Sequence, residues 1–475
     1  MCKVILFGGT TEGRRLADYC SRHHIETVVC VVSDWGAGLL PESPWLRVRT
    51  GAMEAEEMGA LFRREKPALV VDATHPYAAA ATGNIRKACS AGSVPCIRVV
   101  REPWEKDREG GGRTVWVETA GEAADYLSGT EGKILLTTGS KELPVFAGKE
   151  EGAGIEGFEE RVWARVLPSE ESIGLCRRLG VKASQIIAMQ GPFSLEMNMA
   201  VLHMTGARWL VTKESGTAGG FSEKMEAAGR SGVTAVVIGR PGEEEGVSLR
   251  EAVRRLEPYG ESCPRRISLV GIGMGGAGQL TGEARSLVEK AQGIAGAGRM
   301  LDSVSELCAG KEVKGTYKPE EIRQWLEENP QIEEAAVLYS GDTGFYSGAA
   351  ALLELLGKYP DRYATDVIPG ISTVSCLCAR LKTTWEDVYL GSLHGRGLEV
   401  EELLKEHKRV FLLMGKKGSV GELCRRLTAR GLGDIPMAVG MSLSYPEERI
   451  AEGTAREMEK EDFHGLCAVL LGKKT

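Results

Sequence analysis

Two segments of this chain share one local pattern, a short apolar run followed at once by several glycines. The first is Lys3 to Gly13 (KVILFGGTTEG) and the second is Arg265 to Gly276 (RRISLVGIGMGG). The apolar run predicts a buried strand, and glycine lets the backbone approach a ligand closely because it has no Cβ. At 475 residues the chain is too long for one hydrophobic core. We therefore predict two α/β enzymes joined head to tail, each with a nucleotide-type site.

The composition argues against several classes of protein. The chain carries 59 basic and 66 acidic residues, a net charge of -7, whereas a nucleic-acid surface usually needs a basic stripe. No apolar run reaches membrane-spanning length, and the first residues predict a strand rather than a signal peptide. The 12 cysteines and 7 histidines lack the spacing of metal ligands. We expect a cytoplasmic protein with free thiols, no bound metal, no nucleic-acid partner and no membrane partner.

The first glycine turn joins a predicted strand, Lys3–Phe7, to a predicted helix that begins at Thr11. This geometry seats a pyrophosphate on helix N–H groups, although the spacing is not G-x-G-x-x-G and a plain tight turn is the alternative. The next strand ends at Asp34, where a carboxylate can meet the adenosine ribose and favours NADH over NADPH, unless Asp34 merely begins the following loop. The predicted dinucleotide-binding residues are Gly8, Gly9, Thr10, Thr11, Glu12, Gly13 and Asp34.

Later predicted strands of the first half end in polar loops, which in α/β sheets face the ligand. His75 and Tyr77 follow one such strand and are candidate proton donors; His75 could instead orient its own turn, and water could supply the proton. Basic residues gather at the loops, and Arg98 and Arg101 could add to them. In a net-acidic protein this suits a polycarboxylate substrate, with ordinary surface lysines as the alternative. The predicted substrate-binding residues are Thr74, Lys141, Gly191, Pro192, Phe193, Lys213, Ser215, Gly219, Gly220, Lys224 and Arg240.

Seven stretches of the first half resemble the precorrin-6A reductases of corrin-ring synthesis. They are KVILFGGTTEGR, VVDATHPYA, PCIRVVREPW, LLTTGSKEL, QGPFS, VTKESGTAGGFSEK and VIGRP, and the resemblance runs over residues 1–256. It implies a Rossmann-like reductase of two α/β lobes, which we divide near residue 130. It also implies reduction of the C18–C19 double bond of an acetate- and propionate-bearing macrocycle by NADH or NADPH.

Residues 257–266 contain two prolines and a glycine and are predicted to link the halves. In the second half Gly271, Gly273 and Gly276 satisfy G-x-G-x-x-G, but the next strand-like piece ends without an acidic residue, which weakens a second dinucleotide site. Another strand, Ala335–Tyr339, runs into SGDTGFYSG without the lysine of a phosphate loop, so ATP is disfavoured. A glycine turn with an acidic residue suits a zwitterionic or cationic ligand better.

These motifs resemble the tetrapyrrole (class III) S-adenosylmethionine methyltransferases, and among them the methylase that acts on C5 of cobalt-precorrin-7. VGIGMGG, AGAGRMLD, YSGDTGFYSGA, PGISTVSCLCARL, WEDV and SLHGR occur in that order over residues 267–475. Met274 departs from the family, in which proline is common there. The resemblance implies a two-lobed α/β fold, which we divide near residue 382. It also implies S-adenosylmethionine contacts at Gly273, Gly341, Asp342, Thr343, Gly344, Ile371, Ser372, Thr373 and Met414.

Within SLHGR, His394 could remove a proton or only hydrogen-bond a side arm, and Arg396 could bind the substrate. Methyl transfer needs no general acid, because the leaving thioether is not protonated. The sequence thus predicts a bifunctional cobalamin-biosynthesis enzyme that acts on corrinoid polycarboxylates, and we consider a homodimer through the methyltransferase half. Two alternatives stay open: a reductase with a second dinucleotide-binding domain, and a non-catalytic tetrapyrrole or nucleotide sensor.

Overall fold

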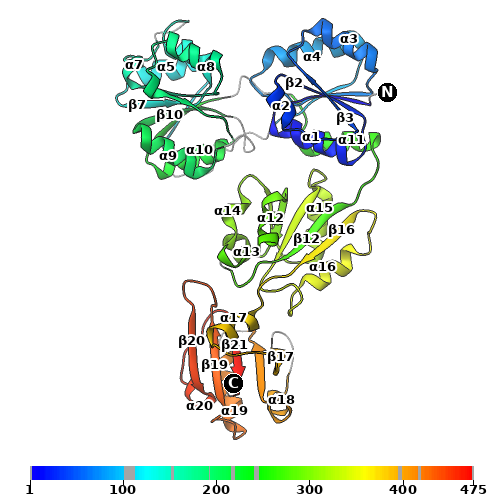
Figure 1. Cartoon of the computed structure of the whole chain (residues 1–475), viewed down its shortest axis with the longest axis vertical. Coiled ribbons are helices and arrows are strands. Elements are labelled where there is room, and N and C mark those ends of the chain that lie inside the picture. Colours follow the sequence, from blue (N-terminus) through cyan, green and yellow to red (C-terminus); the bar gives the residue numbers. More distant parts are fainter. Residues whose placement is uncertain are drawn as a thin grey trace. The chain divides into compact units, whose positions relative to one another are not determined.

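The computed structural model describes residues 3–100, 113–150, 154–191, 193–214, 220–239, 245–275, 277–393, 398–415 and 419–472. The chain divides into two compact units, Met1–Glu261 and Ser262–Thr475. Within the described residues each unit contains two β-sheets with helices packed against them (Figure 1). The α/β class predicted from the sequence is confirmed.

The first sheet has five parallel strands in the order β3-β2-β1-β4-β5. The strands are β1 (Val4–Phe7), β2 (Thr27–Val31), β3 (Leu46–Thr50), β4 (Leu69–Asp72) and β5 (Cys96–Arg98). The helices are α1 (Thr11–Arg22), α2 (Asp34–Gly38), α3 (Ala55–Glu65) and α4 (Ala79–Gly92). In this doubly wound order the chain reverses direction between β1 and β4, and such a reversal leaves a ligand crevice at the carboxyl ends of the two strands.

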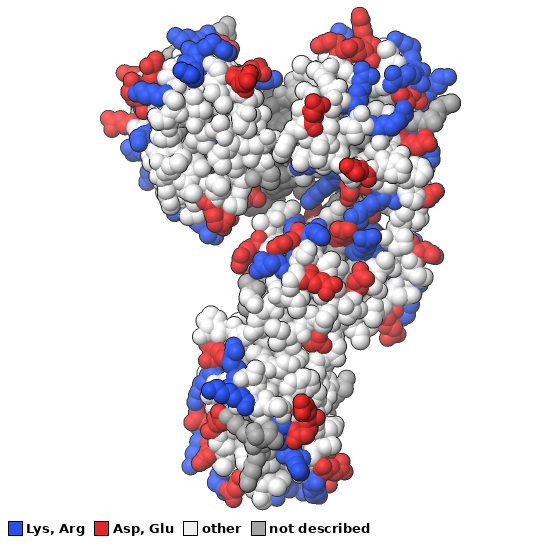
Figure 2. Space-filling model, in the orientation of Figure 1, with Lys and Arg blue, Asp and Glu red and all other residues white. Residues whose placement is uncertain are grey.

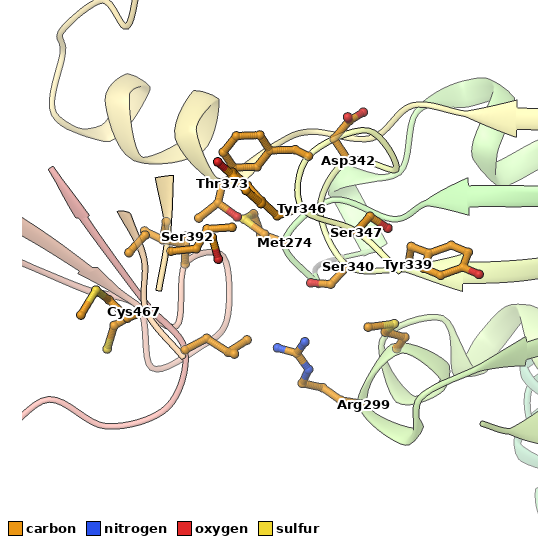
Figure 3. A pocket seen from close by; sticks show the side chains of 18 of the residues that line it. Met274, Arg299, Tyr339, Ser340, Asp342, Tyr346, Ser347, Thr373, Ser392 and Cys467 are labelled. Carbon is orange, nitrogen blue, oxygen red and sulfur yellow. The ribbon is translucent and has the colours of Figure 1, made fainter. Parts of the chain in front are cut away.

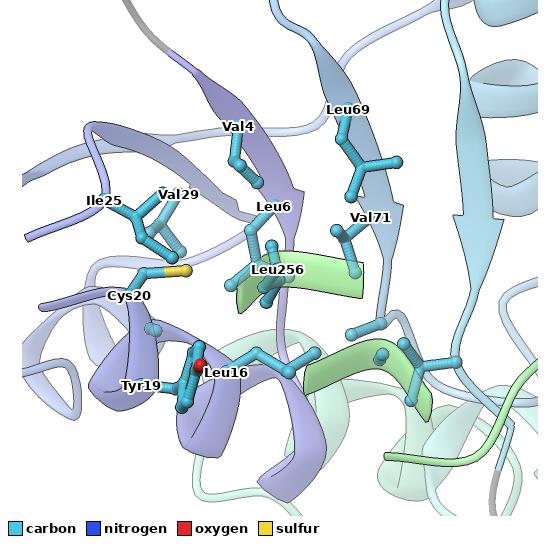
Figure 4. Close-up of a cluster of buried hydrophobic side chains, with 14 of the residues drawn as sticks. Val4, Leu6, Leu16, Tyr19, Cys20, Ile25, Val29, Leu69, Val71 and Leu256 are labelled. Atoms are coloured by element: carbon cyan, nitrogen blue, oxygen red, sulfur yellow. The ribbon is translucent and has the colours of Figure 1, made fainter. Parts of the chain in front are cut away.

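The strands of this sheet are apolar because both faces are covered. On one face the side chains of β1 and β4 pack against Leu16, Tyr19 and Cys20 of α1 (Figure 4). Leu256 completes this cluster from α11 (Leu249–Leu256), which returns to the first sheet after the second sheet is finished. On the other face the residues of α3 and α4 form a separate cluster.

The second sheet has six parallel strands in the order β6-β11-β10-β7-β8-β9. The strands are β6 (Thr114–Val117), β7 (Lys133–Leu136), β8 (Val162–Val166), β9 (Ile186–Ala188), β10 (Ala207–Lys213) and β11 (Thr234–Ile238). The helices are α5 (Ala120–Ser128), α6 (Leu143–Phe146), α7 (Phe158–Arg161), α8 (Glu170–Arg178), α9 (Leu195–Thr205) and α10 (Phe221–Arg230). The predicted division near residue 130 is wrong: β6 already pairs with β11, so the chain changes sheets between β5 and β6.

The third sheet opens the second unit with five parallel strands in the order β14-β13-β15-β12-β16. They are β12 (Arg265–Gly271), β13 (Gly293–Gly296), β14 (Glu312–Gly315), β15 (Glu334–Tyr339) and β16 (Tyr363–Ile368). The helices are α12 (Gly282–Lys290), α13 (Gly298–Ser303), α14 (Ser305–Cys308), α15 (Pro319–Glu328) and α16 (Ala349–Leu356). Its central strands β12 and β15 carry both glycine turns of this half at their carboxyl ends.

The fourth sheet is mixed, in the order β17-β18-β21-β19-β20; among its described strands β17 and β18 pair in parallel and the others pair antiparallel. Its strands are β17 (Val388–Ser392), β18 (Arg409–Leu413), β19 (Pro436–Met441), β20 (Arg449–Thr454) and β21 (Cys467–Leu471). Its helices are α17 (Thr373–Arg380), α18 (Val400–Glu406), α19 (Ser419–Ala429) and α20 (Ala455–Met458). The chain passes from the third sheet to the fourth between β16 and β17.

Candidate active sites

The first candidate site lies at the carboxyl ends of β1 and β4. Thr10 caps α1: its Oγ1 accepts a hydrogen bond from Gly13 N at 3.1 Å and donates one to Ala73 O at 2.8 Å. The capping threonine therefore ties the turn after β1 to the end of β4. Gly9 has φ +119° and no atom within 4 Å of the place a Cβ would take, whereas a Cβ on Gly13 would lie 3.0 Å from Gly8 Cα. The turn is open on one side and closely packed on the other, which suits a ligand lying along the backbone.

Asp34 lies beside this turn, at the tip of β2. Ser33 caps α2 through its Oγ, which accepts from Gly36 N at 3.2 Å, and Asp34 is the first residue of the helix. Asp34 is exposed, as are Val32 (73%) and Trp35 (58%). No lysine or arginine occurs between Ser33 and Leu46. The only formal charges on this stretch are carboxylates, so the stretch itself offers no basic partner to a 2′-phosphate.

A buried ion pair supports the loop after β4. Arg98 Nη1 donates to Asp72 Oδ1 at 2.7 Å, and the two side chains are 4% and 2% exposed. Thr74 joins the pair, because its N and Oγ1 both donate to the same Asp72 oxygen, at 3.0 and 2.7 Å. The suggestion that Arg98 adds to a basic cleft is therefore wrong, because its buried guanidinium is paired with the Asp72 carboxylate inside the loop. Arg101 lies outside the described residues.

Tyr77 connects this loop to the second sheet. Its hydroxyl lies 3.1 Å from Ile238 O and from Gly239 O, and it can donate its proton to one of them at a time. Lys213 lies over the Tyr77 ring, 4.5 Å from its centroid, and forms an ion pair with Glu142. The hydroxyl proton of Tyr77 is thus engaged by backbone carbonyls. His75 is exposed, and its Nδ1 accepts from Tyr77 N at 3.3 Å.

The other predicted substrate residues that the structure describes lie at the carboxyl edge of the second sheet. Lys141 is exposed on the turn after β7, and Gly220 has φ +71° at the start of α10. Phe193 and Lys224 lie near Arg165, which the sequence did not single out. A Cβ on Gly191 would lie 3.1 Å from the Phe193 ring. Pro192, Ser215, Gly219 and Arg240 lie outside the described residues.

The second candidate site is a cavity of about 540 Å³ between the two sheets of the second unit (Figure 3). Of the predicted S-adenosylmethionine residues, Gly341, Asp342, Thr373 and Met414 line it. Gly273 lies directly behind, since its N donates to Gly341 O at 3.1 Å and Gly341 N donates to Gly273 O at 2.7 Å. The structure therefore brings both glycine turns of this half together. Thr343, Gly344, Ile371 and Ser372 adjoin these residues in the chain but do not line the cavity.

The floor of the cavity is made of backbone. Asp342 holds it together, because Oδ1 accepts from Gly344 N at 2.8 Å and Oδ2 accepts from Gly370 N at 3.0 Å. A Cβ on Gly370 would lie 2.2 Å from Gly341 O, and one on Gly271 would lie 2.7 Å from Gly370 N. Side chains cannot be accommodated at these positions. The turns after β12, β15 and β16 consequently form one tight cradle.

The remaining walls come from residues that the sequence motifs did not mark as ligand contacts. Met274 is nearly buried beside the floor, and Arg299 of α13 lies with its guanidinium carbon 5.8 Å from the Tyr445 ring centroid. In Figure 3 the Arg299 side chain points into the space between the two sheets. Ser392 also lines the cavity; His394 and Arg396, two and four residues further on, lie outside the described residues.

In comparisons with known proteins, each half of the chain matches a different family. The family described as "Precorrin-6x reductase CbiJ/CobK" matches residues 3–257, and the family "Tetrapyrrole (Corrin/Porphyrin) Methylases" matches residues 266–459. A probable cobalt-precorrin-7 C(5)-methyltransferase of Methanocaldococcus jannaschii is 31% identical over 209 residues, 42% of this chain and 94% of the relative. The chain belongs to both families, a precorrin-6x reductase fused to a tetrapyrrole methylase.

The reductase half matches its relatives over most of the length of those relatives. A cobalt-precorrin-6A reductase of Priestia megaterium is 33% identical over 256 residues, 53% of this chain and 97% of the relative. One from Methanothermobacter thermautotrophicus is 36% identical over 240 residues, 50% and 76% of the two chains. A solved CobK precorrin-6A reductase superposes with a TM-score of 0.45, at 25% identity over 55% of this chain and 98% of that one.

The methylase half superposes on a solved precorrin-6Y methylase from Archaeoglobus fulgidus with a TM-score of 0.33, at 26% identity over 45% of this chain and 98% of that one. Membership of the methylase family contradicts the alternative of a second dinucleotide-binding domain. The fusion is a bifunctional enzyme, an oxidoreductase followed by a C-methyltransferase. No helix in the described part of the chain is long and apolar enough to cross a bilayer.

Both families imply a cofactor, and the residues present fit each one. In the methylase half the cavity volume of about 540 Å³ lies within the range of roughly 300–1,000 Å³ typical of small-molecule sites, and its floor is formed by the strand-end turns that Asp342 joins. S-adenosylmethionine, when bound there, supplies the methyl group. In the reductase half the open turn at Gly9 fits a dinucleotide diphosphate. A nicotinamide cofactor, when bound there, supplies a hydride.

Proposed function

We propose that the reductase half reduces the C18–C19 double bond of cobalt-precorrin-6A or precorrin-6A. The support is the match of a whole cobalt-precorrin-6A reductase to this half, which covers 97% of that relative. The substrate class agrees with the basic residues at the carboxyl edge of the second sheet, Lys141 and Lys224 among them. Gly191, Phe193, Gly220 and Thr74 would shape the same cleft, together with Pro192, Ser215, Gly219 and Arg240.

The nicotinamide cofactor of this half is proposed to be NADH. Gly8 to Gly13 would hold the diphosphate, and the exposed Asp34 would accept hydrogen bonds from the ribose hydroxyls at the tip of β2. A 2′-phosphate would meet carboxylates and no basic side chain on this stretch. Comparing kcat/KM for the two cofactors tests this, and a preference for NADPH would overturn it.

Proton delivery in the reductase half is assigned to His75, with Tyr77 in a positioning role. His75 is exposed on the loop after β4, whereas the Tyr77 hydroxyl donates to the backbone at the ends of the second sheet. Tyr77 would therefore hold His75 and its loop against that sheet. If histidine donates the proton, the wild-type rate should fall at alkaline pH as His75 deprotonates, and a His75→Gln variant should lose this alkaline limb of its pH–rate profile; if water donates, the two profiles should have the same shape.

The methylase half is proposed to transfer a methyl group to C5 of cobalt-precorrin-7 or precorrin-7. The support is its similarity to the Methanocaldococcus jannaschii relative over 94% of that protein. Gly341, Asp342, Thr373 and Met414 would contact S-adenosylmethionine, with Gly273, Thr343, Gly344, Ile371 and Ser372 behind them. The chain's own contribution is to align the reactants and exclude water. His394 would either remove a proton from the macrocycle or hydrogen-bond one of its side arms, and Arg396 would bind the macrocycle.

One experiment addresses both halves. The whole chain is incubated with cobalt-precorrin-6A and NADH, and separately with cobalt-precorrin-7 and S-adenosylmethionine, and the products are weighed by mass spectrometry. We expect a gain of two hydrogens in the first reaction and of one methyl group in the second. A protein that binds both substrates but changes neither mass would be the non-catalytic sensor instead.

A further inference from the structure

Two basic side chains lie beside each other at the carboxyl edge of the second sheet. Arg165 is the fourth residue of β8, and Lys224 lies in the first turn of α10. Arg165 is 6% exposed and Lys224 is half-buried. Lys224 Nζ donates to Thr212 Oγ1 of β10 at 3.2 Å. Both charges thus sit within the fold, at the edge of the sheet where α/β proteins bind ligands.

The guanidinium of Arg165 is held in one orientation. Its Nη1 donates to Asn198 Oδ1 at 2.8 Å, and its planar group lies over the Phe193 ring, 4.2 Å from the centroid. Asn198 is itself buried and fixed, because its Nδ2 donates to Ser194 O at 2.9 Å. The fork of donors is therefore preorganised before any ligand arrives, which reduces the entropy lost on binding.

Among the residues that the structure describes, no carboxylate forms an ion pair with Arg165 or Lys224, although Glu223 is close enough to Lys224 to act on its pKa. Burial alone lowers the pKa of Arg165 to about 10, with no acidic neighbour opposing it. Burial and then the charge of Arg165 lower the pKa of Lys224 to about 8, although Glu223 acts in the opposite direction. On the face drawn in Figure 2, by contrast, basic and acidic side chains are mixed. Two neighbouring positive charges partly removed from water destabilise a fold unless an anion joins them.

We propose that Arg165 and Lys224 together bind one carboxylate side arm of the reductase substrate, with Asn198 and Phe193 holding Arg165 in position. The guanidinium fork matches the two oxygens of a carboxylate, and the ammonium adds a point charge. The pair lies next to two segments already assigned to the substrate, because Phe193 follows Gly191 and α10 begins after Gly220. This inference rests on the proposed reductase function, which supplies a substrate with acetate and propionate arms.

The decisive variant is Arg165→Met in the full-length chain, with Arg208→Met as the matched control. Arg208 also lies over an aromatic ring of this lobe, 6.0 Å from the Trp209 centroid, but it is exposed at the opposite end of the sheet. The probe is cobalt-precorrin-6A without nicotinamide cofactor. The readout is acetylation of Lys224, followed by peptide mass spectrometry, because this reports on the site itself and not on the methylase cavity.

The corrinoid should protect Lys224 from acetylation in the wild-type chain. The concentration for half-protection should rise by about 10- to 100-fold in Arg165→Met, as expected for a lost charged hydrogen bond, and stay unchanged in Arg208→Met. Protection is the deciding readout, because Arg165→Met removes both a buried charge and the donor to the buried Asn198 Oδ1, and these two losses act on the melting temperature in opposite directions. A structural arginine would leave the half-protection concentration unchanged.

Unchanged half-protection in Arg165→Met, or no protection of Lys224 in wild type, would overturn the proposal. If Arg165→Met does not fold, Arg165→Lys replaces it, since lysine keeps the charge and loses the fork. The proposed reductase function is tested separately by turnover with NADH. A chain that protects Lys224 but does not reduce the corrinoid contradicts the reaction and leaves this carboxylate site standing.

Discussion

At the scale of single residues, the proposed preference for NADH rests on the Asp34 side chain. Replacing it with alanine removes the acceptor for the ribose hydroxyls, so we expect NADH to bind about 10-fold or more weakly. Binding can be followed by the fluorescence of NADH, and Glu42→Ala is the matched control because Glu42 is an exposed carboxylate in the loop that follows α2. Equal NADH affinity in wild type and Asp34→Ala would show that Asp34 only begins helix α2 and does not contact the cofactor.

Lys224 should make the stability of the ligand-free chain depend on pH. Burial, and after it Arg165, lowers the pKa of Lys224 to about 8 in the folded chain, while Glu223 opposes this; the unfolded value is about 10.4. Between these two values the unfolded chain binds more protons, so the contribution of Lys224 to stability rises as the pH increases from about 8 to 10.4. Lys224→Met should lose this rise, which denaturant unfolding across that pH range would detect. If the free energy of unfolding depends on pH in the same way in the wild type and in Lys224→Met over this range, the lowered pKa of Lys224 is contradicted.

At the scale of elements, the methylase cavity depends on three strand-end turns that touch through their backbones. A Cβ on Gly370 would lie 2.2 Å from Gly341 O, so Gly370→Ala should push the turns after β15 and β16 apart. We expect a loss of about 1–3 kcal/mol of stability, typical of overpacking, and weaker binding of S-adenosylmethionine by calorimetry. Gly282→Ala is the control, because nothing lies within 4 Å of that position. If Gly370→Ala and Gly282→Ala have equal stability and equal affinity for S-adenosylmethionine, the three turns can move apart enough to accommodate the extra methyl group.

Elements buried on both faces could be predicted from the sequence, and exposed ones could not. Strands β1 and β4 are short apolar runs because both faces of their sheet are covered. Strand β3 (LRVRT) was missed because it is a largely exposed edge strand with two arginines. Of the antiparallel strands β19 to β21, which the sequence did not predict, β20 has no buried residue, whereas β19 and β21 are buried apolar runs that exposure does not explain. The lobe boundary could not be predicted because β6 pairs with β11, which lies more than a hundred residues later in the chain.

The sites follow the same rule. Gly341, Asp342 and Thr373 could be assigned because strand-end glycine motifs mark them locally, and they do line the cavity. Arg299 and Tyr445 reach the same cavity from elements far apart in the chain. Arg165 lies in an apolar strand, VWARV, and only the packing of α9 and α10 shows that its charge is unmatched. Local patterns therefore located the backbone part of each site and missed the side chains that complete it.

At the scale of the whole molecule, the two units have separate hydrophobic cores. The buried clusters of Met1–Glu261 contain no residue of the other unit, and those of Ser262–Thr475 likewise draw on their own unit alone within the described residues. Units with independent cores unfold independently unless a large interface couples them. We therefore expect two transitions in a calorimetric scan of the full chain.

Each ligand should then stabilise only the unit that binds it, because binding to a folded unit raises the stability of that unit by mass action. At 100 times its dissociation constant, S-adenosylmethionine should add about 2.7 kcal/mol to one transition and NADH the same to the other. At the same ligand concentrations Asp34→Ala should reduce the NADH shift alone, to about 1.4 kcal/mol for a 10-fold loss of affinity, and Gly370→Ala should reduce the S-adenosylmethionine shift alone, which assigns each transition to a unit. A single transition that both ligands shift would instead show that the fusion has become one cooperative folding unit, and that changes in either active site are felt by the other.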